Sequence, residues 1–419
     1  MRVLLLGSGG REHALARALH RDPAVTMLHC APGNPGTAEI ADNHVLDPTD
    51  PVATAELAQR LSPELVVIGP EAPLVAGVAD ELRRRGVPVF GPDREAARIE
   101  GSKAFAKEVM AAAGVPTAAA RVCESGAEVE AALDEFGPPY VVKDDGLAGG
   151  KGVVVTSDRA AAVEHARGCD RVVVEEYLDG PEVSLFALSD GAHAVPLLPA
   201  QDFKRAYDGD AGPNTGGMGA YTTSAGLPWA PPGLVDEVME TVVRPTIAEL
   251  RARQTPYVGV LYAGLALTSR GVRVVEFNAR FGDPETQVVL DRLATPLAGL
   301  LQACAVGNLD PATELEWHPG AAVTVVVAAE GYPEGPVKGD VVAGLPEAAA
   351  VPGAYVLQAG TALDLDEGLL VSAGGRVVNV VGTGADLTAA RAAAYAAVEQ
   401  VRLRGSHHRT DIALRAAAG

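Results

Sequence analysis

Residues 138–157 read PPYVVKDDGLAGGKGVVVTS, two apolar runs separated by a glycine-rich stretch that contains Lys151. The apolar runs predict two strands, and the stretch from Gly146 to Gly152 predicts the loop between them. Glycine lets the backbone bend freely and brings its N–H groups close to a ligand, at a cost in conformational entropy. Such a hairpin can close over a triphosphate as a lid, with its amides and Lys151 facing the phosphate oxygens.

This stretch is not a Walker motif, because Gly152 rather than Ser or Thr follows Lys151 and no helix obviously follows. An ordinary flexible hairpin with a solvated lysine is the structural alternative. Two features favour the lid. Lys143 ends the preceding strand, and residues 175–178 (EEYL) end another strand where backbone groups could contact an adenine edge.

The first hundred residues alternate apolar strands with helical patterns, which predicts an α/β fold with parallel βαβ units. A helix over 99–114 is expected to carry Lys103 and to end at a glycine. Residues 171–188 predict a strand pair, and residues 201–233 a long functional loop. Residues 259–267 and 272–285 predict an antiparallel pair. From about residue 320, short Val-rich strands precede an alanine-rich helix.

Residues 7–13, GSGGREH, lie between a predicted strand and helix, so the amides of Gly9 and Gly10 could hold a phosphate. A dinucleotide fingerprint is disfavoured because Glu12 stands where the third glycine belongs. A purely structural tight turn stays open.

On the strand predicted from residue 272, Glu276, Asn278 and Arg280 share one face by alternation. A carboxylate and an amide oxygen suit Mg²⁺ or Mn²⁺ bound to triphosphate oxygens, and arginine suits a transferred phosphoryl group. The alternative is a solvent-facing polar strand face.

The chain has 419 residues, which predicts two to four domains, and a net charge of −20, which argues against binding to nucleic acid or anionic membranes. Its four cysteines form no CxxC pair, so we expect neither a zinc site nor disulfides. No signal-peptide core or membrane-length apolar run is evident. We expect a cytoplasmic protein, a monomer or weak homodimer.

Several stretches together resemble the glycinamide ribonucleotide synthetase (phosphoribosylamine–glycine ligase) family of the ATP-grasp superfamily. In order they are GSGGREHALA, APGNPGTA, GPEAPLVAGV, FGP, EGSKAFAKE, VVK with DGLAGGKGV, VVVEEYLDG, QDFKR, GPNTGGMGAY, GVLYAGL and EFNARFGDPETQ, and the tail contains GGRVVNV and RTDI. The stretches RFGDPETQ and GPNTGGMGAY are specific to this family, whereas the glycine lid is shared more widely.

The resemblance implies an N-terminal Rossmann-like domain over 1–101, an ATP-grasp domain over 102–318 with a small lid lobe at about 117–188, and a C-terminal α/β domain over 319–419. It implies that ATP is used to join glycine to 5-phosphoribosylamine through a glycyl phosphate. The products are glycinamide ribonucleotide, ADP and phosphate in de novo purine synthesis.

Site roles follow from the resemblance by motif position. For the nucleotide it implies Lys103, Lys143, Gly146, Gly149, Gly150, Lys151, Gly152, Glu175, Tyr177, Leu178 and Glu182. It implies Glu276 and Asn278 for the metal, Arg280 and Lys143 for catalysis, and Gly9, Gly10, Asn34, Glu71, Asp202, Arg280 and Asp283 for phosphoribosylamine or the acid.

The chain departs from the family pattern at Asp144 and Gly149, where alanine is usual. By alternation Asp144 should face away from Lys143, so we expect it to be tolerated. Two other functions stay open: an ATP-grasp ligase for another acid and amine, and a nucleotide-binding regulatory protein without turnover.

Overall fold

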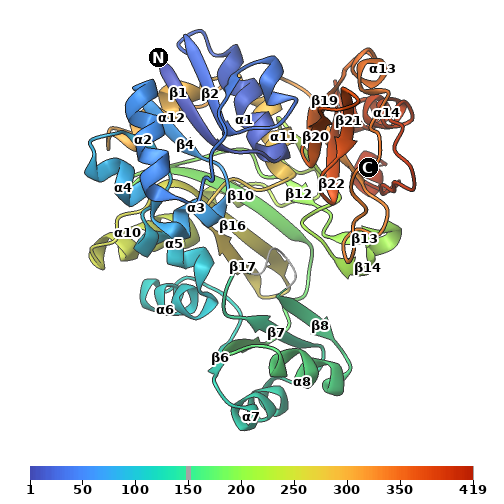
Figure 1. The fold of residues 1–419 in the computed structure, drawn as a ribbon. Helices are drawn as coiled ribbons and strands as arrows, with labels where there is room; N and C mark the ends of the chain where they lie inside the picture. The colour runs from blue at the N-terminus through green and yellow to red at the C-terminus, as the bar shows by residue number, and fades with distance from the viewer. Residues whose placement is uncertain (148–151, 419) are drawn as a thin grey trace.

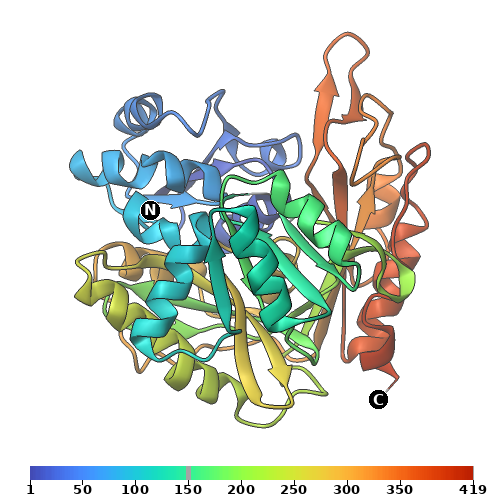
Figure 2. The same ribbon diagram turned by 90° about the horizontal axis from the view of Figure 1, so that it is seen from below.

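The computed structural model describes residues 1–147 and 152–418. Figure 1 shows the N-terminal residues as one layered unit, the C-terminal residues as a second, and a small lobe that stands apart below the central sheet. Figure 2, seen from below, shows the small lobe in front of that sheet. No helix in these ranges is long and apolar enough to cross a membrane.

The N-terminal unit is built on a parallel sheet in the order β3-β2-β1-β4-β5, which confirms the βαβ prediction. Its central strand is buried from Val3 to Leu6, as an apolar strand covered on both faces must be. The elements are β1 (Arg2–Gly7), α1 (Gly10–Arg21), β2 (Met27–Pro32), η1 (Thr37–Glu39), β3 (Asp42–Asn43), α2 (Pro51–Leu61), β4 (Leu65–Ile68), α3 (Glu71–Ala76), α4 (Val78–Arg84), β5 (Val89–Phe90) and α5 (Arg94–Gly101).

The prediction of a single helix over 99–114 is wrong. The chain forms α5 and then α6 (Lys103–Ala113), with Ser102 in extended conformation between them. The Ser102 hydroxyl accepts a hydrogen bond from the Phe105 N–H and donates to Asp145 at 3.0 Å. The new N-cap places Lys103 in the first turn of α6. Gly114 ends α6 at φ +67°, as expected.

The small lobe is an antiparallel sheet in the order β6-β9-β7-β8, packed against two helices. The two strands predicted around the glycine stretch are β7 and β8, and they pair with each other. The lobe comprises β6 (Ala120–Cys123), α7 (Gly126–Phe136), β7 (Tyr140–Asp144), β8 (Val153–Thr156), α8 (Arg159–Arg167) and β9 (Val172–Glu175).

The central sheet, in the order β11-β10-β16-β17, is antiparallel, and the predicted pairing of β16 with β17 is confirmed. The strands expected as a pair over 171–188 are β9 and β10, but they lie in different sheets. The elements are β10 (Glu182–Asp190), β11 (Ala194–Pro196), α9 (Leu234–Val238), a π-helical turn η3 (Met239–Val243), α10 (Arg244–Ala252), β16 (Val258–Thr268), β17 (Gly271–Asn278), α11 (Glu285–Arg292) and α12 (Leu297–Ala305).

The prediction of a long loop over 201–233 is wrong for its first part, which contains strands. The third sheet, β12-β15-β18-β22-β19, draws its first two strands from this region, and β13 and β14 form a hairpin. A side chain at Gly219 would come within 2.6 Å of the Thr324 carbonyl oxygen, so glycine lets β15 approach β18 closely. At least one of the glycines that suggested a loop, Gly219, therefore serves strand packing.

This sheet combines strands from both sides of residue 318. Its elements and neighbours are β12 (Gln201–Asp202), β13 (Arg205–Tyr207), η2 (Asp208–Asp210), β14 (Ala211–Asn214), β15 (Gly219–Thr223), β18 (Ala321–Ala328), α13 (Leu345–Ala349), β19 (Ala354–Gln358), β20 (Thr361–Asp364), β21 (Leu369–Ser372), β22 (Arg376–Gly384), α14 (Leu387–Val398) and α15 (Leu414–Ala417). The predicted Val-rich strands and alanine-rich helix are β18, β22 and α14.

Arg409 ties the hairpin to the C-terminal segment. Its side chain is 1% exposed, binds Asp210 at 2.8 Å and Asp411 at 2.7 Å, and donates to the Arg205 carbonyl oxygen at 3.2 Å. A buried guanidinium needs such partners, because an unpaired charge is costly to bury. Residues 205–214 therefore depend on the C-terminal segment for their position.

We predict that Ser102→Ala loosens α6, because the helix loses its N-cap and Asp145 loses a hydroxyl partner. The loss of a cap costs about 1 kcal/mol, which corresponds to roughly fivefold faster amide exchange by local opening. Hydrogen–deuterium exchange of residues 103–113 measures it, with the exposed Ser269→Ala as control. Unchanged exchange in Ser102→Ala would contradict the capping role.

Candidate functional site

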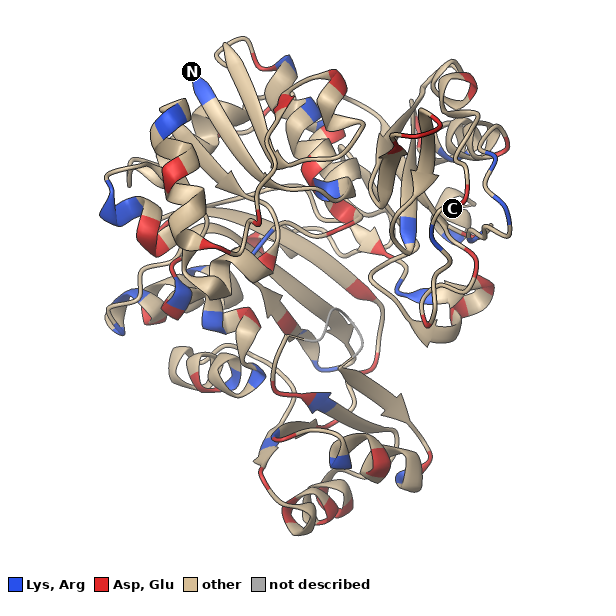
Figure 3. Cartoon of the chain, viewed as in Figure 1, with Lys and Arg blue, Asp and Glu red and all other residues tan. Residues whose placement is uncertain are grey.

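Glu276 and Asn278 lie on one face of β17 and are partly exposed, while Phe277 and Ala279 are buried on the other face. The predicted alternation is therefore present. Burial alone would raise the pKa of Glu276, but Lys204, Lys143 and Lys103 outweigh it and lower that pKa. Glu276 is consequently an ionised carboxylate among cations. Lys and Arg positions (blue) and Asp and Glu positions (red) occur together between β17 and the small lobe (Figure 3).

Lys143 connects the small lobe to the central sheet. Its ammonium group is 2.9 Å from a Glu175 carboxylate oxygen and donates to the Val275 carbonyl oxygen at 2.9 Å. The other Glu175 oxygen is 3.1 Å from Lys107 Nζ. Burial lowers the pKa of Lys107, although Glu175 opposes this. Two lysines therefore occupy the Glu175 carboxylate, and the adenine contact expected for its backbone stays a prediction.

The glycine stretch is described at its two ends. Lys103 Nζ donates to the Gly146 carbonyl oxygen at 3.0 Å, and the Gly152 carbonyl oxygen accepts from the Asp144 N–H at 2.7 Å. The predicted nucleotide contacts Gly149, Gly150 and Lys151 lie outside the described residues.

Asp144 lies against Cys169, on the side of β7 opposite to buried Lys143. Burial raises the pKa of the Cys169 thiol, and the charge of Asp144 raises it further. The expected orientation of Asp144 is therefore present.

A second cluster of charged side chains lies around Lys204, where the segment after β9 reaches β10. Tyr177 is exposed, Leu178 is half-buried, and Glu182 opens β10 and pairs with Lys204 at 2.5 Å. Despite burial, Glu182, Asp202 and Glu276 raise the pKa of Lys204. Burial raises the pKa of Asp202 to about 7, with Lys204 opposing it. The predicted residues Glu182, Asp202 and Glu276 thus surround one lysine that sequence reasoning missed.

Arg280 is enclosed by carboxylates. Its guanidinium contacts Glu71 at 3.2 Å and Glu100 at 3.1 Å, and donates to Asn278 Oδ1 at 3.3 Å and to the Phe281 carbonyl oxygen. Although burial opposes its charge, Glu100 and Glu71 raise the pKa of Arg280. In this arrangement the arginine orients Asn278 and Glu71. Its expected contact with a phosphoryl group stays a prediction.

The N-terminus of α1 meets residues from distant parts of the chain. The Gly9 N–H donates to Glu12 at 2.6 Å, and the Arg11 N–H donates to Asp283 at 3.4 Å. A side chain at Gly10 would collide with the amide of Asn379 on β22. Gly10 therefore has a packing role in addition to the phosphate contact expected for it, which stays a prediction.

Asn34 lies close to this helix end but uses its side chain within the protein. Its amide donates to the carbonyl oxygens of Ser8 at 2.8 Å and Gln358 at 3.0 Å, and its Oδ1 accepts from the Thr37 N–H. Both amide hydrogens of Asn34 are thus used, and the expected sugar contact, for which Oδ1 has a second lone pair, stays a prediction.

Sequence reasoning missed several polar residues that complete these clusters. They are Glu100, Lys107, Lys204, Tyr262, Glu285 and Arg376. Tyr262 donates to Glu285 at 2.5 Å, and Arg376 donates to the Asp283 carbonyl oxygen at 2.6 Å. The only sequence signal for them was their presence inside motifs such as EGSKAFAKE, QDFKR and RFGDPETQ. Spacing could not show which of these side chains meet.

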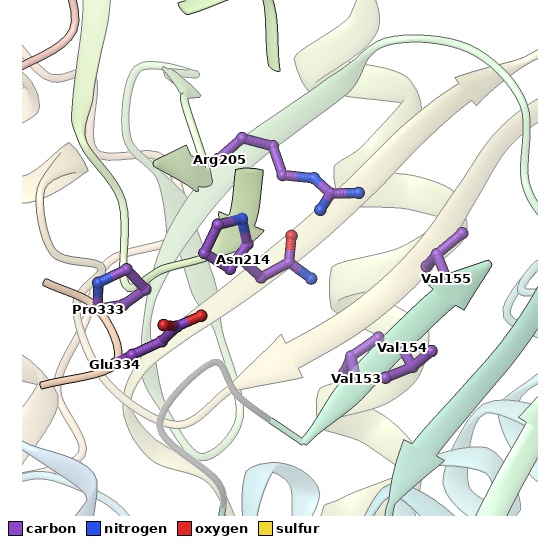
Figure 4. A pocket seen from close by; sticks show the side chains of 8 residues that line it. Val153, Val154, Val155, Arg205, Asn214, Pro333 and Glu334 are labelled. Carbon is purple, nitrogen blue, oxygen red and sulfur yellow. The ribbon is translucent and has the colours of Figure 1, made fainter. Parts of the chain in front are cut away.

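A cavity of about 300 Å³ separates the small lobe from the β13–β14 hairpin and residues 333–334. In Figure 4, Arg205 and Asn214 lie across from the valines of β8. The cavity borders the beginning of β8, directly after residues 148–151. The C-terminal segment therefore contributes, through residues 333–334, to the wall of a cavity beside β8.

We predict that the stability of the ligand-free protein falls between about pH 4 and pH 7 through Asp202. Its pKa is raised from 3.8 to about 7 in the folded state. As pH rises through this range, the carboxyl ionises in the unfolded chain but stays protonated in the folded protein, which favours the unfolded state. The Asp202→Asn variant removes this loss, which is on the order of 2 kcal/mol. Thermal unfolding at several pH values measures it. An equal pH profile for wild type and Asp202→Asn, with the exposed Asp366→Asn as control, would contradict the raised pKa.

Comparison with known proteins agrees with this geometry. Residues 1–100, 101–286 and 322–415 match the N domain, the ATP-grasp (A) domain and the C domain of phosphoribosylglycinamide synthetase. The phosphoribosylamine–glycine ligase of Streptomyces coelicolor is 66% identical over 419 residues, covering 100% of both chains, and that of Leifsonia xyli is 57% identical over 420 residues, covering 99% of this chain and 100% of the relative.

Solved structures show the same relationship. The phosphoribosylamine–glycine ligase of Thermotoga maritima matches with a TM-score of 0.83 and 35% identity, covering 98% of this chain and 100% of that chain. The biotin carboxylase domain of Hydrogenobacter thermophilus 2-oxoglutarate carboxylase, at 16% identity and a TM-score of 0.71, covers 97% and 91% and shows only the shared fold. The chain therefore belongs to the phosphoribosylamine–glycine ligase family of ATP-grasp enzymes.

Proposed function

We propose that this chain uses ATP to join glycine to 5-phosphoribosylamine, giving glycinamide ribonucleotide, ADP and phosphate in purine biosynthesis. The observation that carries the proposal is the ionised Glu276 beside Asn278 on β17, facing lysines from the small lobe and from β12–β13. Family membership over the whole chain supports the substrates. The Streptomyces, Leifsonia and Thermotoga proteins named above are phosphoribosylamine–glycine ligases.

The residues of this face fit a magnesium nucleotide. Mg²⁺ typically takes one or two protein oxygens and several phosphate and water oxygens, and Glu276 and Asn278 offer such a pair. When bound, Mg²⁺ or Mn²⁺ would neutralise phosphate charge. Among the described residues no group of three His, Cys, Asp or Glu side chains could hold a metal alone, which agrees with a site that phosphate oxygens complete.

Two lysines can bind the phosphates without losing their present partners. An ammonium group has three N–H donors. Lys143 uses two on Glu175 and Val275, and Lys103 uses one on Gly146, so each retains a donor for a phosphate oxygen. We assign the backbone of Glu175, Tyr177 and Leu178 to the adenine, Glu182 to the ribose, and the hairpin from Gly146 to Gly152 to the cover over the phosphates.

The reaction needs no protein nucleophile. A glycine carboxylate oxygen attacks the terminal phosphorus of ATP, the bond to ADP breaks, and glycyl phosphate forms. The amine nitrogen of phosphoribosylamine then attacks the carbonyl carbon, phosphate leaves, and the nitrogen loses a proton. Asp202, with a pKa of about 7, is suited to accept that proton. The chain contributes mainly positioning and electrostatic stabilisation.

For phosphoribosylamine we propose the end of α1, where Gly9, Gly10 and Asp283 meet, with Asn34 and Glu71 beside it. The proposed domains are residues 1–101, 102–318 and 319–419, and their boundaries place this site between the first and the second. We further propose a cytoplasmic monomer or weak homodimer.

We predict that phosphate release requires ATP, Mg²⁺, glycine and freshly generated phosphoribosylamine together. The variant Glu276→Ala should lower kcat/KM by about 10²–10³-fold, because ionised carboxylate and metal are lost together. The control Glu56→Ala changes an exposed carboxylate on α2. Turnover with a different acid or amine, and none with glycine, would overturn the substrate assignment and keep the ATP-grasp reaction.

We predict that Asp144→Ala leaves the KM for ATP within about twofold of wild type, because this carboxylate lies beside Cys169 and not beside Lys143. Steady-state kinetics with varied ATP measures the effect. A tenfold change in KM would show that Asp144 reaches the nucleotide.

A further inference from the structure

A second groove, of about 320 Å³, lies along the C-terminal half of α1, between this helix, α11, residues 293–297 and Tyr355 of β19. Figure 1 shows α1 and α11 side by side at this place. Its volume is in the range of small-ligand sites. The residues assigned above to ATP, metal and phosphoribosylamine do not line it.

The two carboxylates of the groove are engaged by donors of the protein. Asp22 accepts from the Ala24 N–H at 2.9 Å and from the Ala298 N–H, at the beginning of α12, at 2.8 Å. Asp291 is bound by the guanidinium of Arg292 at 2.5 Å and 2.9 Å. Both carboxylates therefore already have hydrogen-bond donors from the protein.

The basic side chains of the groove are less fully paired, since Arg17 has one long ion pair, to Asp291. The Arg17 guanidinium stacks on the Tyr355 ring at 3.6 Å, and its nearest carboxylate oxygen, on Asp291, is 3.9 Å away. Arg21 and His318 are exposed, and neither makes an ion pair within residues 1–147 and 152–418. Stacking holds the fork of Arg17 in place while its N–H donors stay open to the groove.

We propose that this groove binds a small phosphate dianion, either inorganic phosphate or a phosphate monoester, between Arg17, Arg21 and His318. A fixed guanidinium fork matches two phosphate oxygens, and such charge-assisted hydrogen bonds are strong. Arg17 and Arg21 are one turn apart on α1, and His318 lies on the opposite wall, so all three side chains can reach one anion in the groove. This binding site goes beyond the proposed function and does not depend on it.

The groove is in contact with the proposed substrate site. Tyr355, on whose ring Arg17 stacks, donates from its hydroxyl to the Gln287 carbonyl oxygen at 3.4 Å. The side chain of Gln287 in turn donates to Asp283 at 2.7 Å. An anion that holds Arg17 should therefore restrain α1 and α11 together.

The test is calorimetric titration of the full chain with inorganic phosphate and, separately, with ribose 5-phosphate at constant ionic strength. Arg21→Gln and Arg17→Gln should each weaken the groove component by about tenfold or more. Arg60→Gln, an exposed arginine on α2, should leave it unchanged. Binding of both anions indicates phosphate as the shared determinant, and binding of the ester alone indicates recognition of its sugar.

Hydrogen–deuterium exchange gives a second readout that does not need activity. Phosphate should slow exchange in residues 14–21 and 285–292 of wild type and of Arg60→Gln, and not of Arg21→Gln. Equal titrations and exchange in wild type and both groove variants would overturn the proposal, as would equal weakening by Arg60→Gln. Normal anion binding in a chain without glycine-dependent turnover would count against the proposed function alone.

Discussion

The buried ion cluster of Lys143, Glu175 and Lys107 is the contact on which the arrangement of the candidate site depends. Lys143 belongs to the small lobe, yet it donates to the Val275 carbonyl oxygen of β17, one residue before Glu276. Charges in such an environment are tolerated only when each has partners, so removing one member leaves another unpaired. The same cluster therefore holds β7 and β9 of the small lobe against the acidic face of β17.

The C-terminal residues form the other side of the site. The third sheet includes β12 and β15, which come from the middle of the chain, and pairs them with β18 and β22. Arg376 donates to the carbonyl oxygens of Gly216 and Asp283, and Arg409 holds Asp210. Asp202 and Asp283 are consequently placed by strands and arginines far from them in sequence, and the C-terminal unit contributes to the geometry of the candidate site.

Local patterns predicted much of the fold because their causes are local. The buried run of β1, the β7–β8 hairpin and the alternation of Glu276 and Asn278 depend on residues a few positions apart. The errors arose where a distant partner decided the outcome. Ser102 ends α5 in part because Asp145 accepts a hydrogen bond from its hydroxyl, and Gly219 packs against Thr324 of β18. No local pattern distinguishes such a glycine from one in a loop.

By itself the sequence determined the α/β class, the strands around the glycine stretch and, through the resemblance of its motifs, the family and the candidate residues. Only the tertiary structure decided which of those residues meet, and with which partners. In the folded protein Arg280 lies between Glu71 and Glu100, and Lys204 forms an ion pair with Glu182. Burial in the fold raises the pKa of Asp202. The reason is physical: burial and the charges of neighbours set the state of a polar side chain, and these neighbours lie tens to hundreds of residues away along the chain.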